Sequence, residues 1–255
     1  MFIDLNSDLG ESFGNYKIGN DAEVMKYITS ANIACGFHAG DPLIIEKTIK
    51  LAIENNVAIG AHPGYPDLAG FGRRSLKLSD EELASAIKYQ VGAVKSIAES
   101  LGTKLQHVKL HGAMYNDLAF NYNKARIATE AISGIDSDLI FVGLAGSEMI
   151  KAAKDVGLKT ADEFFADRAY NDDRTLVSRS VEGSVIHDTM VCLSRIERLV
   201  KSNSVLSINN KEIEIHANTI CVHGDNKNAV GFVKNLNIFL KEKGIKLKNL
   251  KDQNL

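Results

Sequence analysis

Short apolar runs alternate with longer amphipathic stretches along the whole chain. Strand-length runs that alternate with helical stretches are typical of repeated βα units around a parallel sheet. Seven runs qualify: FIDLN (2–6), ANIAC (31–35), VAIGA (57–61), HVKLH (107–111), LIFVGL (139–144), LKTADEF (158–164) and NTICVH (218–223). The pattern therefore predicts an α/β protein built on a parallel sheet.

Capping signals mark the start of two helices. Ser79 precedes Asp-Glu-Glu, which makes a capping box with Glu82 and predicts a helix from Ser79 to Gly102. Asp41 followed by Pro42 predicts the start of another helix. An amphipathic stretch predicts a third long helix over residues 184–200.

Two further segments lie outside this rhythm. SVLSINNKEIEIH (204–216) alternates apolar and polar residues around Asn209-Asn210, which predicts a β-hairpin before the last strand. The lysine-rich end KEKGIKLKNLKDQNL (241–255) predicts a frayed surface tail. Because no repeat, linker or break in composition is found, we expect one domain over residues 1–255.

Composition narrows the class of protein. The 255 residues are 45% hydrophobic and 24% charged, as in a globular protein, and a parallel β/α barrel commonly reaches this length. A net charge of -2 gives no electrostatic footprint for nucleic acid or an anionic membrane. There is no leader-like N-terminus, no membrane-length apolar run and no CxxC spacing among the three cysteines. We therefore expect a cytoplasmic protein without nucleic-acid or membrane partners.

Polar side chains gather on one face of the predicted strands. Successive side chains on a strand point to opposite faces, so the residues opposite the apolar positions should point into the barrel. The inward set is Asp4, Asn6, Asp8, His38, His62, Lys109, His111 and His223. Most of these lie at the carboxyl ends of strands, where β/α barrels place their active sites. A buried Lys109 needs acidic neighbours, and Asp4 and Asp8 are the candidates.

The remaining histidines fit structural roles. His216 continues the polar face of the hairpin, His187 falls in the predicted third helix, and His107 points inward but away from the open mouth. Two loops carry additional charge: 60–75 contains Asp67, Arg73 and Arg74, and 163–179 contains Glu163, Asp167, Arg168 and Arg179. Arginine in such loops suits carboxylates and phosphates.

Several common motifs of nucleotide-binding proteins and hydrolases are absent from the sequence. GxxxxGK[ST], a GxGxxG after a strand, GxSxG and HExxH are all absent. No local motif therefore identifies a nucleotide site, a serine-hydrolase elbow or a zinc-protease helix.

Six ordered motifs together give a specific resemblance. They are DLNSDLGESFG (4–14), NIACGFHAGDP (32–42), GAHPGYPD with GFGRR (60–74), HVKLHGAMYN (107–116), EFFADRAY with LVSR (163–179) and ICVHGDN (220–226). In this order the chain resembles the LamB/YcsF family over essentially its full length. It departs from the family pattern at Ser7, Leu110, Arg174 and Ser178.

The resemblance implies a fold and a reaction. The implied fold is a seven-stranded β/α barrel of the glycoside hydrolase and deacetylase type. The implied reaction is ATP-dependent hydrolysis of 5-oxo-L-proline to L-glutamate, with ADP and phosphate as the other products. It also implies that this chain acts in a complex with partner subunits B and C.

Candidate roles follow from this chemistry. We expect Asp8, Lys109, His111 and His62 to act in catalysis, with a carboxylate or imidazole activating water and Lys109 stabilising negative charge. Candidates for substrate binding are Asn6, His38, Arg168, Arg179, His223 and Asp225. Two alternatives stay open: a deacetylase-like hydrolase with a divalent metal on Asp8, His62 and His111, and an accessory protein that delivers substrate within the complex.

Overall fold

The fold is described from a computed structural model that covers residues 2–222, 229–253 and 255. The elements in chain order are β1 (Phe2–Leu9), α1 (Asp21–Val24), η1 (Met25–Tyr27), β2 (Ser30–Ala34), α2 (Pro42–Glu54), β3 (Ala58–His62), α3 (Asp80–Ser100), β4 (Leu105–Lys109), α4 (Gly112–Ala119), α5 (Tyr122–Ser133), β5 (Ile140–Leu144), α6 (Glu148–Asp155), β6 (Lys159–Phe165), α7 (Thr189–Ser202), β7 (Ser204–Leu206), β8 (Glu212–Glu214), β9 (Thr219–Cys221), α8 (Ala229–Glu242), β10 (Lys246–Leu247) and η2 (Leu250–Gln253).

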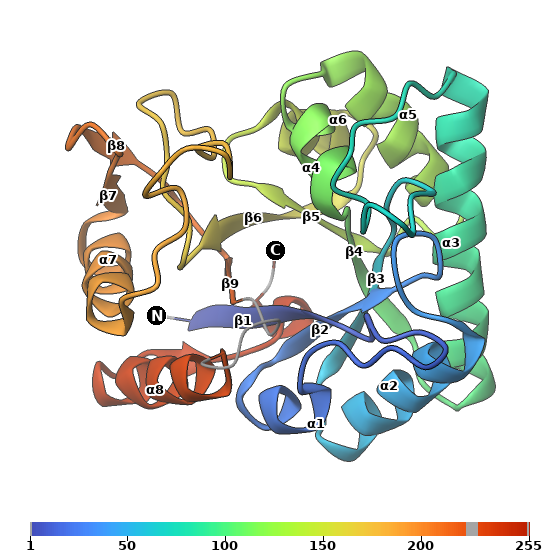
Figure 1. Cartoon of the computed structure of the whole chain (residues 1–255), viewed down its shortest axis with the longest axis horizontal. Coiled ribbons are helices and arrows are strands. Elements are labelled where there is room, and N and C mark those ends of the chain that lie inside the picture. Colours follow the sequence, from blue (N-terminus) through green and yellow to red (C-terminus); the bar gives the residue numbers. More distant parts are fainter. Residues whose placement is uncertain (1, 223–228, 254) are drawn as a thin grey trace.

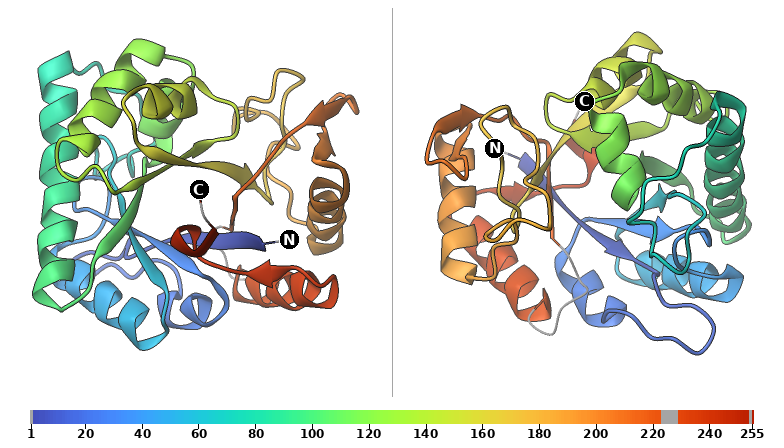
Figure 2. Two further views of the ribbon diagram at one scale, coloured as in Figure 1. Left: turned by 180° about the vertical axis from the view of Figure 1, so that it is seen from behind. Right: turned by 45° about the horizontal axis from the view of Figure 1, so that its top comes forward.

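Seven parallel strands form the barrel, in the order β1, β2, β3, β4, β5, β6 and β9. Pairing of β9 with β1 closes the ring, and the helices surround it (Figures 1 and 2). Each of the seven apolar runs falls on one of these strands, so the predicted fold class is confirmed. The apolar positions of β1, such as Ile3 and Leu5, belong to the core between sheet and helices. The alternate positions therefore line the barrel.

The two predicted helix starts are also confirmed. Ser79 and Glu82 form the expected capping box at α3, and Asp41 accepts a hydrogen bond from the Ile44 amide at the start of α2. The predicted third helix is wrong in its first five residues, since α7 begins at Thr189 after the N-cap Asp188. Residues 184–188 are not helical because their backbone pairs with the segment after β6, as in the bond from the Ile186 amide to the Asp167 carbonyl.

The predicted hairpin is confirmed as β7 and β8. The two strands pair antiparallel, with Ser204 opposite Glu214. Asn210 has a φ of 59° in the turn between them, a left-handed conformation that asparagine tolerates. The hairpin lies beside α7 at the outer edge of the molecule (Figure 1).

The prediction of a frayed tail is wrong. β10 pairs parallel with the start of β1, and Leu250 in η2 is fully buried against Ile140, Val142 and Ala161. These partners occupy inward positions at the amino end of β5 and β6. The apolar residues between the lysines of the tail therefore close one end of the barrel. In Figure 1 the C-terminus appears within the ring of strands.

The described part of the chain contains no helix that is both long and apolar enough to cross a membrane.

Candidate active site at the carboxyl end of the barrel

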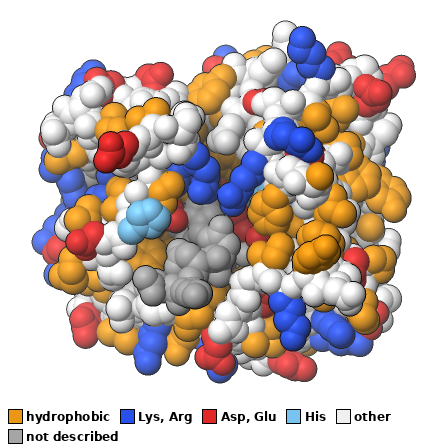
Figure 3. All heavy atoms as spheres, viewed as in Figure 1, with side chains coloured by type: hydrophobic (Ala, Val, Ile, Leu, Met, Phe, Trp, Pro, Cys, Tyr) orange, Lys and Arg blue, Asp and Glu red, His pale blue; other side chains and the backbone are white. Residues whose placement is uncertain are grey.

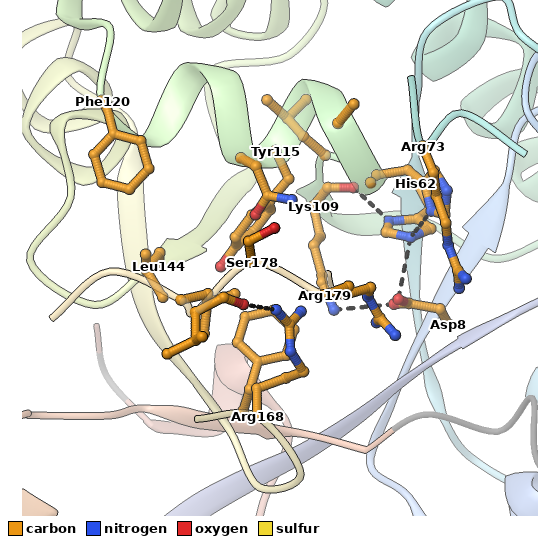
Figure 4. Close-up of a pocket in the computed structure, with 18 of the residues that line it drawn as sticks. Asp8, His62, Arg73, Lys109, Tyr115, Phe120, Leu144, Arg168, Ser178 and Arg179 are labelled. Atoms are coloured by element: carbon orange, nitrogen blue, oxygen red, sulfur yellow. Dashed lines mark hydrogen bonds and ion pairs between the residues drawn. The ribbon is translucent and has the colours of Figure 1, made fainter. Parts of the chain in front are cut away.

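A cavity of about 390 Å³ lies at the carboxyl ends of the strands. Its lining combines polar and apolar side chains. The polar ones are Asp8, Glu11, His62, Arg73, Lys109, His111, Tyr115, Asn116, Arg168, Ser178 and Arg179, and the apolar ones are Leu110, Phe120, Leu144, Phe165, Leu176 and Val177. Figure 3 shows a hollow near the middle of one face with basic side chains at its edge. In the close-up, Asp8 and His62 lie on one side and Phe120 and Leu144 on the other, with Lys109 between them (Figure 4).

Lys109 is the centre of a buried charge network. Its Nζ lies 2.8 Å from Glu163 Oε1, 3.0 Å from Asp8 Oδ1 and 3.2 Å from Asn6 Oδ1, although only 2% of the residue is exposed. Burial alone would lower the pKa of Lys109, but the Asp8 and Glu163 carboxylates raise that pKa well above its usual value. The lysine is therefore a fixed cation at neutral pH, as the expected pairing with Asp8 requires.

Neighbouring side chains hold these acids in place. Tyr115 donates a 2.8 Å hydrogen bond to Glu163 Oε2, and Asn32 donates a 2.8 Å bond to Asp8 Oδ1. The Cys221 thiol lies 3.1 Å from Lys109 Nζ, and burial raises its pKa well above the usual value, so it stays protonated. The network leaves Asp8 Oδ2 directed towards the histidines.

Three histidines pack together beside Asp8. His62 donates from Nδ1 to the Lys109 carbonyl over 2.7 Å, and His111 donates from Nε2 to the Phe71 carbonyl over 2.9 Å. Their other nitrogens face each other at 3.0 Å, and Asp8 Oδ2 lies 3.3 Å from His62 Nε2. His38 stacks on His111 with 3.6 Å between the ring centroids.

Burial and neighbouring imidazoles lower the pKa of both His38 and His111 well below the usual value. Glu11 completes this group: its Oε1 is 3.6 Å from His38 Nε2 and 3.8 Å from His111 Nδ1. The donor atoms of Glu11, His38, His62 and His111 all lie within 4.8 Å of one another, and all four residues are buried. This group has the composition of a site for a divalent metal.

Glycine allows the loop after β3 to pack on the histidines. A Cβ at Gly72, where φ is +61°, would lie 2.7 Å from His38 Cβ and 2.8 Å from His111 Cδ2. The loop thereby brings the Phe71 carbonyl to His111, and Asp67 binds Arg74 within the same loop.

A second set of cations lies beyond Lys109. Arg168 is buried, and among the described residues its side chain donates to two backbone carbonyls, from Nε to Ser184 over 3.2 Å and from Nη2 to Val177 over 2.6 Å. Burial and the nearby Arg179 lower the pKa of Arg168 to about 10, so it remains charged at neutral pH. Since no carboxylate among the described residues pairs with Arg168, this end of the cavity suits an anionic group.

The structure brings together most of the residues that the sequence selected. Asp8, His62, Lys109, His111, Arg168 and Arg179 line the cavity, while Asn6 and His38 contact that set from behind. His223 and Asp225 lie outside the described residues.

Sequence reasoning missed two members of the site and gave a third no specific role. Glu11 and Tyr115 were not selected, and Glu163 was noted only among the charges of a loop. Glu163 could have been found, because it occupies the position two after the inward Ala161 in β6. Glu11 gave no comparable signal, since it follows β1 in a loop.

The other histidines lie away from the cavity. His107 is buried low in the barrel with Nε2 2.9 Å from Asn32 Oδ1, and His216 is exposed beside Glu214. His187 is also exposed, but it precedes α7 rather than lying in it.

These features define a parallel β/α-barrel protein with a polar, strand-end cavity of the kind found in barrel enzymes. The sequence matches the LamB/YcsF family over residues 3–255, and the chain belongs to that family.

Relatives and a solved structure agree with this assignment. The chain is 52% identical to the A subunit of 5-oxoprolinase from Campylobacter jejuni over 96% of both chains. It is 54% identical to the A subunit of 5-oxoprolinase from Thermococcus sibiricus over 99% of both. The crystal structure of the lactam utilization protein from Thermus thermophilus superposes with a TM-score of 0.92 at 38% identity, covering 97% of this chain and 99% of that one.

Proposed function

We propose that this chain is the A subunit of an ATP-dependent 5-oxoprolinase that acts in the cytoplasm with subunits B and C. The complex would convert 5-oxo-L-proline, ATP and two waters to L-glutamate, ADP and phosphate. The observation that carries the proposal is the 52–54% identity to 5-oxoprolinase A subunits over nearly the whole chain. The solved lactam utilization protein with the same fold supports a cyclic amide as substrate.

The cavity has the polarity that 5-oxo-L-proline requires. This substrate is a small ring with a carboxylate on one side and a lactam carbonyl on the other. Arg168 and Arg179 would bind the carboxylate, and the apolar wall formed by Leu144 and Phe165 would contact the ring methylenes. The lactam group would then face Asp8 and the histidines.

The hydrolytic step needs an activated carbonyl and an activated water. Amide resonance makes a lactam a poor electrophile, and phosphorylation of the carbonyl oxygen by ATP would remove that resonance. Addition of water to the carbon and expulsion of the ring nitrogen, which takes up a proton, would break the C–N bond and give an acyl phosphate. A second water would hydrolyse the acyl phosphate to L-glutamate and phosphate. Asp8, which borders the cavity through a carboxylate oriented by Lys109 and Asn32, would accept the proton from the attacking water. Lys109 would stabilise negative charge in the transition state, and His62 and His111, which line the cavity beside Asp8, would border the attacking water.

ATP would be handled together with the partner subunits, because the sequence contains no phosphate-binding loop. The test is glutamate formation from 5-oxo-L-proline and ATP by this chain alone, by subunits B and C alone, and by all three together. We expect turnover only with all three. Robust ATP-dependent turnover by the single chain would overturn its assignment to a multi-component enzyme.

Each of the two alternatives predicts a different result in an assay of its own. A deacetylase-like hydrolase would release acetate from N-acetylated sugars without subunits B and C. An accessory protein would leave the activity of the complex intact when Asp8 is replaced by asparagine.

A further inference from the structure

The hydrogen bonds of His62 and His111 determine where each ring carries its proton. A backbone carbonyl only accepts hydrogen bonds, so His62 must carry a proton on Nδ1 and His111 must carry one on Nε2. In the neutral rings, His62 Nε2 and His111 Nδ1 are then both unprotonated. These two nitrogens face each other at 3.0 Å, where two lone pairs repel. Something positively charged between them would remove the repulsion.

His38 supplies a second, independent sign of a missing partner. It is fully buried, and neither ring nitrogen has a hydrogen-bond partner in the described part of the structure. Its Nδ1 is directed towards Gly64, while its Nε2 lies 3.6 Å from the Glu11 carboxylate. A buried polar group without a partner is costly, so its retention here calls for a ligand.

We propose that Glu11, His38, His62 and His111 bind one divalent transition-metal ion through a carboxylate oxygen and three imidazole nitrogens. Tetrahedral coordination with bonds near 2.1 Å would separate neighbouring donor atoms by about 3.4 Å. The observed separations of 3.0, 3.6 and 3.8 Å bracket that value. Three imidazoles favour Zn²⁺ or a related first-row ion over Mg²⁺ or Ca²⁺.

The surroundings of the rings support this ligand set. Histidines that bind metals usually donate their second N–H to a carbonyl or carboxylate, as His62 and His111 do here. This set differs from the sequence-based one of Asp8, His62 and His111. Asp8 is engaged through Oδ1 by Lys109 and Asn32 and is not part of the close group of donor atoms. It remains beside the metal as a base.

The inference goes beyond the proposed reaction, because metal binding can be measured without any substrate. Glu11, His62 and His111 line the cavity, so the ion would be within reach of a bound molecule. There it could polarise a carbonyl or phosphoryl oxygen or a water.

The first experiment measures metal in the full-length chain. The purified protein is stripped with a chelator, dialysed against Zn²⁺ or Co²⁺, and analysed for metal content. We expect one ion per chain, and we expect Co²⁺ to give the visible absorption of a four-coordinate nitrogen and oxygen site. No stoichiometric binding in the folded wild-type chain would overturn the proposal and would leave a proton shared between His62 and His111 as the alternative.

Variants then test the ligand set. His38→Gln and Glu11→Gln should each weaken Zn²⁺ binding by more than the roughly 10- to 100-fold that loss of an outer hydrogen bond costs. His216→Gln removes an exposed histidine outside the site and should bind Zn²⁺ like wild type. Equal loss in all three variants would mean surface binding and would overturn the assignment.

Folding of each variant is checked by circular dichroism. If a variant does not fold, the Co²⁺ spectrum of the wild-type chain still decides the question. Metal binding without 5-oxoprolinase activity would support this inference and refute the proposed function, whereas an active complex whose A subunit binds no Zn²⁺ or Co²⁺ would do the reverse.

Discussion

The two ends of the barrel interior are built from the same strands but differ in how they are filled. At the carboxyl end, Lys109, Asp8 and Glu163 form a charged network that borders an open cavity. At the amino end, Ile140 and Leu250 fill the interior with apolar side chains. The inward positions of the same strands thus form two different regions. The apolar region at the amino end stabilises the fold, and the polar region at the carboxyl end borders the cavity.

Asp4 lies between these two environments. It is fully buried, and the hydroxyl groups of Thr29, Ser30 and Thr219 donate hydrogen bonds to it. Burial raises its pKa to about 6, whereas Asp8 forms an ion pair with the nearby Lys109 ammonium. An acid deeper in the barrel is therefore stabilised by neutral donors, and an acid at the mouth is stabilised by charge.

The largest effect on stability is expected from Lys109→Met at the open end. The substitution leaves the buried Glu163 and the partly exposed Asp8 without their cation, and breaking a buried ion pair such as Lys109–Glu163 costs about 3–5 kcal/mol in the free energy of unfolding. Urea denaturation measures this loss, with Lys201→Met on the exposed surface of α7 as a control that should change little. Adding Glu163→Gln to Lys109→Met should restore part of the stability. If Lys109→Met alone is as stable as wild type, the ion pairs of Lys109 with Asp8 and Glu163 do not stabilise the fold.

Leu250→Ala tests the closed end. Removing this fully buried side chain should lower the free energy of unfolding by about 2–5 kcal/mol. The rate of glutamate formation should not change, because Leu250 lies at the opposite end from the cavity. Leu43→Ala, at an exposed position of α2, is the matched control. If Leu250→Ala leaves the melting temperature unchanged, the C-terminal segment does not close the barrel.

The smallest expected effect is on the pH dependence of stability. Because the pKa of Asp4 is raised in the folded state, the folded protein holds this proton more tightly than the unfolded chain does. The resulting stabilisation is fully present below pH about 4 and is lost as the pH rises through about 6, with an amplitude on the order of 3 kcal/mol. In Asp4→Asn this contribution should be absent, so wild type minus variant stability should fall as the pH rises from about 4 to about 6. A flat difference would mean that folding does not raise the pKa of Asp4.

Strand periodicity accounts for what could be predicted from the sequence. The two-residue period of a strand placed Asn6, Asp8 and Lys109 on the inner face of the barrel. Because the strands are parallel, residues near their carboxyl ends lie at the same end of the barrel. The same rule would have found Glu163 if the two faces of the predicted strand 158–164 had been separated in the same way. Prediction failed where position depends on tertiary packing, as for Glu11 in a loop and Leu250 among lysines.

In the proposed mechanism the lactam is hydrolysed at the carboxyl end of the barrel, beside Asp8. The most direct test is glutamate formation by the three-subunit complex containing Asp8→Asn, with the exposed Asp138→Asn as the control. Loss of a general base should reduce turnover by about 10²- to 10⁴-fold, while the variant still folds and still assembles with subunits B and C. A folded, assembled Asp8→Asn complex that forms glutamate at the wild-type rate would contradict this mechanism.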